Sequence, residues 1–193
     1  MARKKYEFRP DVERNDILGK ILLTKQQRQS VLRWTLFALV CLVGLLLQDV
    51  VMSRVSILGA TTDLVPCCIL AVCILQGAEI GCVFALTGSV LYYFSGSAPG
   101  AYVIPLITGI SVLAAIFRQG YLRKGFSALL LCGSVGLMLY ELCVFGIGLF
   151  LGYTRLDRVG SFCLTALYTL ATLPILYPIL LSIGKIGGET WKE

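Results

Sequence analysis

Long apolar stretches alternate with short polar segments over most of this chain. Four of them approach or exceed the roughly 20 mostly apolar residues that a helix needs to cross a hydrocarbon core. They are residues 31–51, 101–117, 126–151 and 162–183. The pattern predicts a membrane-spanning helix in each stretch.

A fifth apolar region, residues 64–94, is interrupted only by Gln76, Gly77 and Glu79. One straight helix of that length would measure about 46 Å, which exceeds the roughly 30 Å of a hydrocarbon core. We therefore predict two short helices, over about 64–75 and 79–94, joined by the turn QGAE. Spans this short imply either local thinning of the bilayer or shielding by neighbouring helices.

Composition agrees with this pattern. Of the 193 residues, 57% are hydrophobic and only 15% are charged, whereas soluble domains have about 25% charged residues. The chain is therefore interpreted as an integral membrane protein. Residues 31–183 form one six-helix membrane domain, between an N-terminal tail (1–30) and a short C-terminal tail (184–193).

The distribution of basic residues predicts the orientation of the helices. With six spans and both termini cytoplasmic, 14 of the 17 Lys and Arg lie on the inner side and three on the outer side. A five-span arrangement would give 11 inside and six outside. Because cytoplasmic loops are enriched in Lys and Arg, the predicted fold is all-α, with about six spans and cytoplasmic N- and C-termini.

The tail formed by residues 1–30 is basic. Nine Lys and Arg fall within the first 33 residues. They favour a solvated segment that sets topology, and they also suit contact with anionic lipids, at ~1 kcal/mol per basic residue near the surface. Residues 16–30 are a candidate for a short interfacial helix. Nucleic-acid binding is not expected, because no stacking aromatic residues are interleaved with the basic ones.

The sequence offers no catalytic or metal-binding constellation. It contains no His, and its eight Cys all fall within apolar stretches without a CxxC pair. Free Cys behaves as a small hydrophobic residue, so we interpret these thiols as packing groups. No cofactor and no enzymatic activity are expected.

Small residues mark helix faces that can approach one another closely in lipid. In the predicted third span they recur every four residues, and one further glycine widens the stripe: Gly77, Gly81, Ala85, Ser89 and Gly88. The stripe is a candidate for packing within the bundle or for contact with a partner protein.

Glu141 is a carboxylic acid within a run of about 26 otherwise uncharged residues. At 100° per residue it shares a helix face with Ser134, Gly148 and Gly152. Acids within membranes nearly always face the bundle interior, so we expect a neutral, hydrogen-bonded carboxyl group. The candidate partners are Tyr168, Thr165, Thr169, Tyr92 and Tyr93. A structural hydrogen bond, a contact with a partner helix, and a proton or ligand site are the three roles considered.

Three segments resemble the MreD family of rod shape-determining membrane proteins. They are LLLQDVVMSRVSILGATTDLVPCCILAV, then QGAEIGCVFALTGSVLYYFSGSAPG, then YE within the fifth span. The resemblance extends over roughly residues 31–183. Two departures are Tyr92, where the family often has Asp, and the longer N-terminal tail.

The resemblance implies a non-enzymatic adaptor of the cell-elongation and peptidoglycan-synthesis machinery in the bacterial cytoplasmic membrane. Its expected partners are MreC and, through MreC, MreB, RodA and a class B penicillin-binding protein. The MreD family is also similar in fold to the substrate-binding S components of energy-coupling-factor vitamin transporters. That alternative function predicts polar and aromatic groups converging near the outer side, whereas the adaptor needs no polar pocket.

Overall fold

The computed structural model describes residues 25–54, 60–123 and 125–186, and within these ranges it contains helices and no strand. Four helices are long: α2 (Lys25–Val50), α5 (Val103–Tyr121), α6 (Phe126–Phe150) and α7 (Val159–Gly184). Two are shorter, α3 (Leu64–Gln76) and α4 (Ala78–Phe94), and two are single 3-10 turns, η1 (Met52–Arg54) and η2 (Leu156–Arg158). The predicted all-helical class, with short second and third helices in the bundle, is confirmed.

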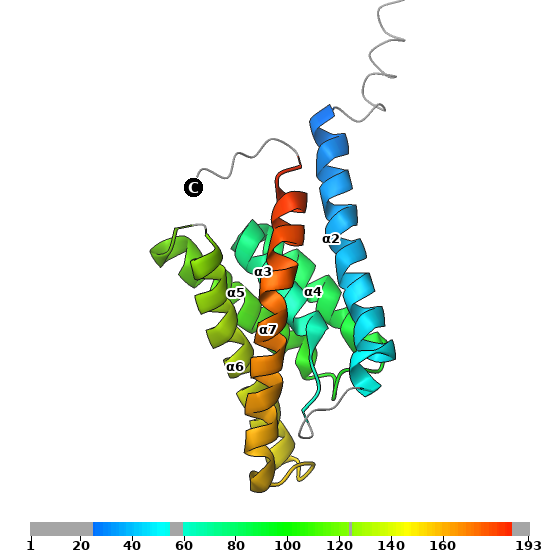
Figure 1. Cartoon of the computed structure of the whole chain (residues 1–193), viewed down its shortest axis with the longest axis vertical. Coiled ribbons are helices and arrows are strands. Elements are labelled where there is room, and N and C mark those ends of the chain that lie inside the picture. The colour runs from blue at the N-terminus through cyan, green and yellow to red at the C-terminus, as the bar shows by residue number, and fades with distance from the viewer. Residues whose placement is uncertain (1–24, 55–59, 124, 187–193) are drawn as a thin grey trace, which may run out of the picture.

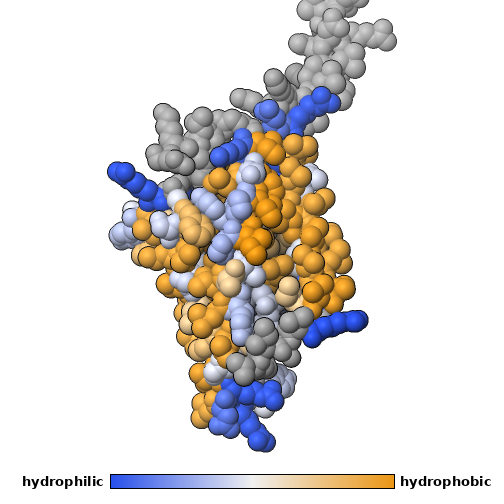
Figure 2. Space-filling view, viewed as in Figure 1, coloured by the Kyte–Doolittle hydropathy of each residue, from blue (hydrophilic) through white to orange (hydrophobic). Residues whose placement is uncertain are grey.

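The four long helices are apolar enough and long enough to cross a membrane, by length and composition. In Figure 2 hydrophobic side chains cover much of the visible face on both sides of a central stripe of weakly hydrophilic residues, and most of the strongly hydrophilic side chains lie towards the two ends. This distribution matches the requirements of a hydrocarbon core bounded by water. The fold is therefore consistent with an α-helical membrane protein.

Helix α3 lies at the centre of the bundle. It packs against α2, α4, α5, α6 and α7, and every residue from Leu64 to Leu75 is buried. This explains why its sequence is apolar on all sides, as expected for a helix without a solvent-facing stripe. The sequence analysis predicted that short helices require either local thinning of the bilayer or shielding by neighbouring helices. Helix α3 is shielded by its neighbours.

Helix α2 contacts the bundle along one narrow stripe. Phe37, Cys41, Gly44 and Gln48, spaced three or four residues apart, are buried on this face. The opposite face carries exposed large apolar residues, among them Leu39, Leu42, Leu46 and Val50. In a membrane this second face is exposed to lipid or to another apolar helix.

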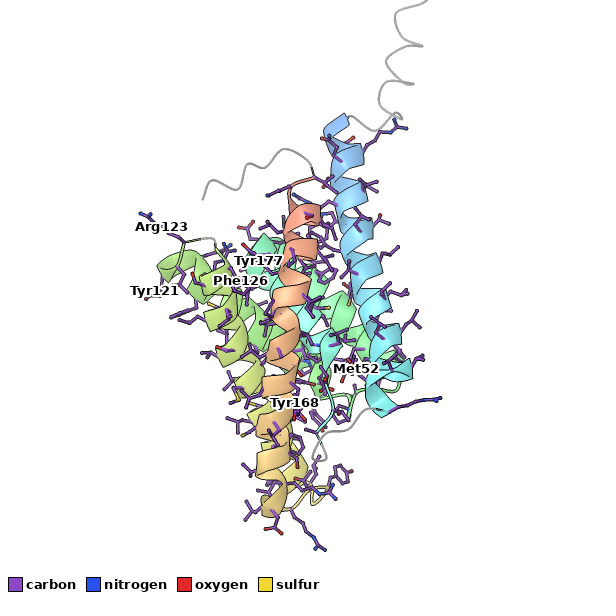
Figure 3. All side chains as sticks on the ribbon, viewed as in Figure 1. Met52, Tyr121, Arg123, Phe126, Tyr168 and Tyr177 are labelled. Atoms are coloured by element: carbon purple, nitrogen blue, oxygen red, sulfur yellow. The ribbon has the colours of Figure 1, made fainter. Side chains whose placement is uncertain are left out.

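Successive helices run in opposite directions, so α2 begins and α7 ends at the same end of the molecule (Figure 1). Figure 3 shows Met52, just after α2, towards the other end of the bundle from Tyr121 and Arg123, at the connection between α5 and α6. Helices α3, α5 and α7 begin at the Met52 end. We call it the cavity end, for the cavity described below.

Several helix boundaries differ from the predicted ones. Helix α2 begins at Lys25, six residues before the predicted start of the first span, and α5 continues to Tyr121 with the Arg118 side chain buried within it. Hydropathy detects only the part of a helix within the hydrocarbon core, whereas a helix can continue among polar headgroups. The interfacial helix predicted over residues 16–30 lies outside the described residues, apart from 25–30, which belong to α2.

Candidate functional site

Polar side chains from five different parts of the chain meet at the first turn of α3. The amide groups that begin a helix have no partner within it, and α3 is too deeply buried for water to satisfy them freely. Gln48 of α2 supplies one acceptor, since its Oε1 accepts a 2.9 Å hydrogen bond from the amide of Val65. Thr169 of α7 supplies another, since its Oγ1 accepts a 3.0 Å bond from the amide of Asp63.

Gln48 also connects α2 to two other members of this group. Its Nε2 donates to Asp63 Oδ1 at 3.5 Å and to the Tyr92 hydroxyl at 3.4 Å. Tyr92 is buried on α4, and Asp63 is the half-buried residue that precedes α3. We use the name polar cluster for Gln48, Asp63, Tyr92, Glu141 and Thr169.

Glu141 enters the polar cluster from the middle of α6 and is only 4% exposed. Its carboxyl group interacts with the carboxyl group of Asp63, and both acids line the cavity described below. Two neighbouring buried carboxylates repel each other, so one of the two groups favours carrying a proton. Burial raises the pKa of the Asp63 carboxyl above its ordinary value, which favours sharing of a proton between the two acids.

The sequence analysis did not include Asp63 among the candidate partners of Glu141. Of the five that it named, Thr169 bonds the backbone of Asp63 and Tyr92 bonds Gln48, and no described hydrogen bond joins Thr165, Tyr168 or Tyr93 to Glu141. Figure 3 shows Tyr168 on the half of α7 nearer the cavity end. Asp63 was missed because an acid at the start of a helix is an ordinary capping residue. Its side chain makes no capping bond within the described structure, however.

A cavity of about 740 Å³ lies beside the polar cluster. Asp63, Tyr92, Tyr140 and Glu141 line its inner part, and residues from the connections and from the start of α7 line the rest, including Ser97, Tyr102, Tyr153, Thr154, Arg158 and Phe162. Three buried polar atoms in this lining have no hydrogen-bond partner among the described residues: Glu141 Oε1, Tyr140 Oη and Thr154 Oγ1. The cavity is therefore polar and aromatic, and it has unused hydrogen-bonding capacity.

The small-residue stripe on α4 packs inside the bundle. A Cβ atom at Gly81 would lie 2.6 Å from Cys73 Sγ and 2.9 Å from Cys73 Cα, and one at Gly88 would lie 3.0 Å from Ile69. Ala85 and Ser89 are fully buried, and the Ser89 hydroxyl lies 3.3 Å from that of Thr108 on α5. These residues lie against α3 and α5, away from the surface open to a partner.

Gly77 is the single residue between α3 and α4. Its φ of 103° and ψ of 168° lie in a region that is essentially restricted to glycine. The predicted four-residue turn QGAE is thus shortened to one residue, because Gln76 still belongs to α3 and Ala78 already begins α4.

The prediction that Ser134, Glu141, Gly148 and Gly152 share one helix face is confirmed only in part. Glu141 and Gly148 are buried, but Ser134 is half-buried and bonds its own helix through Leu131 O. Gly152 lies beyond the end of α6, exposed in a turn with φ 75°, so the helical angle used for the prediction does not apply to it.

Helix α6 approaches its neighbours through two other glycines. A Cβ atom at Gly133 would lie 2.8 Å from Leu173 of α7, and one at Gly136 would lie 2.6 Å from Leu70 of α3. The segment CGSVG, residues 132–136, contains both glycines and Ser134. Only the positions of α3 and α7 show that the two glycines, rather than Ser134, form the close contacts.

All eight cysteines lie in described helices as free thiols. Within the described ranges, no group of three or more His, Cys, Asp or Glu residues could hold a metal ion. The chemistry available at the site is hydrogen bonding, proton sharing between two carboxyl groups, and attraction of charge.

These features are those of a helical bundle with four helices apolar and long enough to span a membrane, and with a polar cluster and a cavity at one end. The sequence matches no protein-family model, and neither a curated protein nor a solved structure matches the chain.

Proposed function

We propose that this chain is a non-enzymatic adaptor of the bacterial cell-elongation machinery, similar to MreD. In this proposal it crosses the cytoplasmic membrane six times and both termini are cytoplasmic, as the distribution of Lys and Arg favours. The cavity end then faces the outside. Its partners are MreC and, through MreC, MreB, RodA and a class B penicillin-binding protein, and the basic tail contacts anionic lipids.

One observation carries the proposal. The polar residues within the three segments that resemble MreD are far apart in the sequence, and they meet in the polar cluster. Gln48 and Asp63 come from the first segment, Tyr92 from the second and Glu141 from the third. Sequence markers that meet in one polar cluster support a resemblance to MreD more strongly than separate apolar patterns do.

Tyr92 fits this view, although it stands where the MreD family often has Asp. Its hydroxyl receives a hydrogen bond from Gln48 inside the polar cluster. A phenol can thus occupy a polar position that an acid would otherwise fill. Since Asp63 and Glu141 already share this space, a neutral group at residue 92 avoids a third buried acid.

Helix α2 offers a surface for a partner helix. Its bundle-facing stripe is narrow, and the remaining surface consists of exposed Leu and Val side chains. Helices associate in lipid by close packing of such surfaces. The membrane helix of MreC is the occupant that the proposal expects there.

The test is co-purification of the tagged chain with the MreC protein of the same organism, after mild detergent extraction. We expect a stable complex. Replacing Leu39, Leu42 and Leu46 together by Ala should weaken it, whereas replacing the exposed Leu113, Ile116 and Phe117 of α5 by Ala should not. Absence of MreC from the purified material would contradict the adaptor function.

The cavity favours a second candidate, the S component of an energy-coupling-factor vitamin transporter. This function predicts polar and aromatic groups converging near the outer side, and the lining of the cavity has this character. Thermal stabilisation of the purified chain by one member of a vitamin panel, together with no association with MreC, would favour the S component over the adaptor.

A further inference from the structure

The floor of the cavity carries negative charge. Asp63 and Glu141 both line the cavity and their carboxyl groups interact, and one proton shared between the two acids leaves a single negative charge. Glu141 Oε1 is buried and has no partner among the described residues. A buried carboxylate oxygen without a donor is costly, so this atom can accept a hydrogen bond from a ligand.

The wall beside the floor is aromatic. Tyr92, Tyr102, Tyr140 and Phe162 line the cavity, and the buried Tyr140 hydroxyl lacks a described partner. Aromatic rings attract ammonium groups through the negative charge of their faces, and sites for organic ammonium ions commonly combine such rings with an acid. The inner part of the cavity therefore suits a cation that also carries hydrogen-bond donors.

The mouth of the cavity carries the opposite charge. Arg158, at the end of η2, lines the cavity and is exposed, while Ser161 and Thr154 add hydroxyl groups close to it in the sequence. A guanidinium group binds carboxylates through paired hydrogen bonds. The cavity is thus negative at its floor and positive at its mouth.

From this polarity we propose that the cavity binds a small zwitterionic amine, with its ammonium group at the Asp63–Glu141 pair and its anionic group at Arg158. The volume of about 740 Å³ lies in the range of small-molecule sites, roughly 300–1,000 Å³. The inference depends on the cavity alone and holds whether the chain is an adaptor or a transporter subunit.

The experiment measures the melting temperature of the full chain in mild detergent with a matched set of probes. The probes are linear ω-amino acids of increasing length, with the amines and the carboxylates of the same lengths. A ligand that binds only the folded state raises the melting temperature. We expect ω-amino acids of suitable length to raise it by about 5 °C or more at saturation, amines to raise it less, and carboxylates not at all.

Two variants test the assigned ends of the ligand. The double variant Asp63→Asn with Glu141→Gln removes the negative charge of the floor and should abolish stabilisation by both amines and ω-amino acids. Glu79→Gln, an exposed acid of α4 outside the cavity lining, should leave it intact. Arg158→Gln should reduce the response to ω-amino acids to that of the matched amines. Arg155→Gln is the control, because it removes a nearby exposed charge that does not line the cavity. It should leave the response to ω-amino acids larger than the response to the matched amines.

Several outcomes would overturn the proposal. These are stabilisation by carboxylates as strong as that by amines, an absence of stabilisation by every probe, or equal responses of Arg158→Gln and Arg155→Gln. Should the Asp63→Asn, Glu141→Gln double variant fail to fold, the comparison of the two exposed arginines still decides the matter, because neither side chain belongs to the core.

Discussion

The sequence predicts that Glu141 is buried, whereas only the structure shows which residue it meets. Its position in an apolar run predicts burial, and the structure places it with 4% of its surface exposed. The sequence could not identify its partner, because Asp63 lies in the connection before α3 and resembles an ordinary helix cap. Gln48 and Tyr140 were missed for a similar reason: each is a common residue near a helix end or within an apolar run.

The pairing of Glu141 with Asp63 leads to a prediction for two substitutions. Glu141→Gln keeps a group that donates to Asp63, so its stability should change by less than ~1 kcal/mol. Glu141→Leu leaves Asp63 without this partner, and an unsatisfied buried polar group costs ~1–3 kcal/mol. Thermal unfolding of the purified variants should therefore show a melting temperature about 2–10 °C lower for the Leu variant. Equal melting temperatures for both variants and the wild type would reject the pairing of Glu141 with Asp63.

At the scale of elements, the hairpin of α3 and α4 is the most constrained part of the fold. A single residue, Gly77, reverses the chain, and Gly81 brings α4 into van der Waals contact with the backbone of α3 at Cys73. The sequence predicted two short helices here, because one helix would be too long for the bilayer. It could not show that the stripe of small residues on α4 packs against α3 and α5.

A substitution at Gly77 tests this hairpin. Gly77→Ala forces a side chain into a backbone conformation that costs ~1–3 kcal/mol for residues other than glycine, so the melting temperature should fall. Gly109→Ala is the matched control, because Gly109 lies within α5 with nothing within 4 Å of an added Cβ. In a helix interior this change should be neutral or stabilising by up to ~1 kcal/mol. A Gly77 variant as stable as the Gly109 variant would argue against the tight reversal.

At the scale of the whole molecule, the arrangement is one short buried helix surrounded by five others. α3 needs no contact with lipid, so its length of 13 residues does not have to match the bilayer. The surrounding helices carry the apolar outer surface, and the connections at the cavity end, together with the polar cluster, form the cavity. A site of this kind exists only when all the helices are assembled.

The orientation of the bundle is a prediction at this scale. Because Lys and Arg are concentrated in the tail and in the connection between α5 and α6, we expect these parts to be cytoplasmic. A green fluorescent protein fused to the C-terminus should fluoresce in a bacterial host, and alkaline phosphatase fused after Arg155 should be active. The proposed topology would be contradicted if the C-terminal green fluorescent protein did not fluoresce and the alkaline phosphatase fused after Arg155 were inactive.

The sequence by itself determined the helical class, the approximate extent of each helix and the unusual position of Glu141. These properties depend on local hydropathy summed over consecutive residues, which the chain carries whether or not it is folded. The tertiary structure alone decided that α3 is central, that Gly133 and Gly136 rather than Ser134 and Gly152 make the close contacts of α6, and that Asp63 meets Glu141. Such contacts join residues far apart in the chain, and their energies arise only when packing excludes water and lipid from the space between the helices.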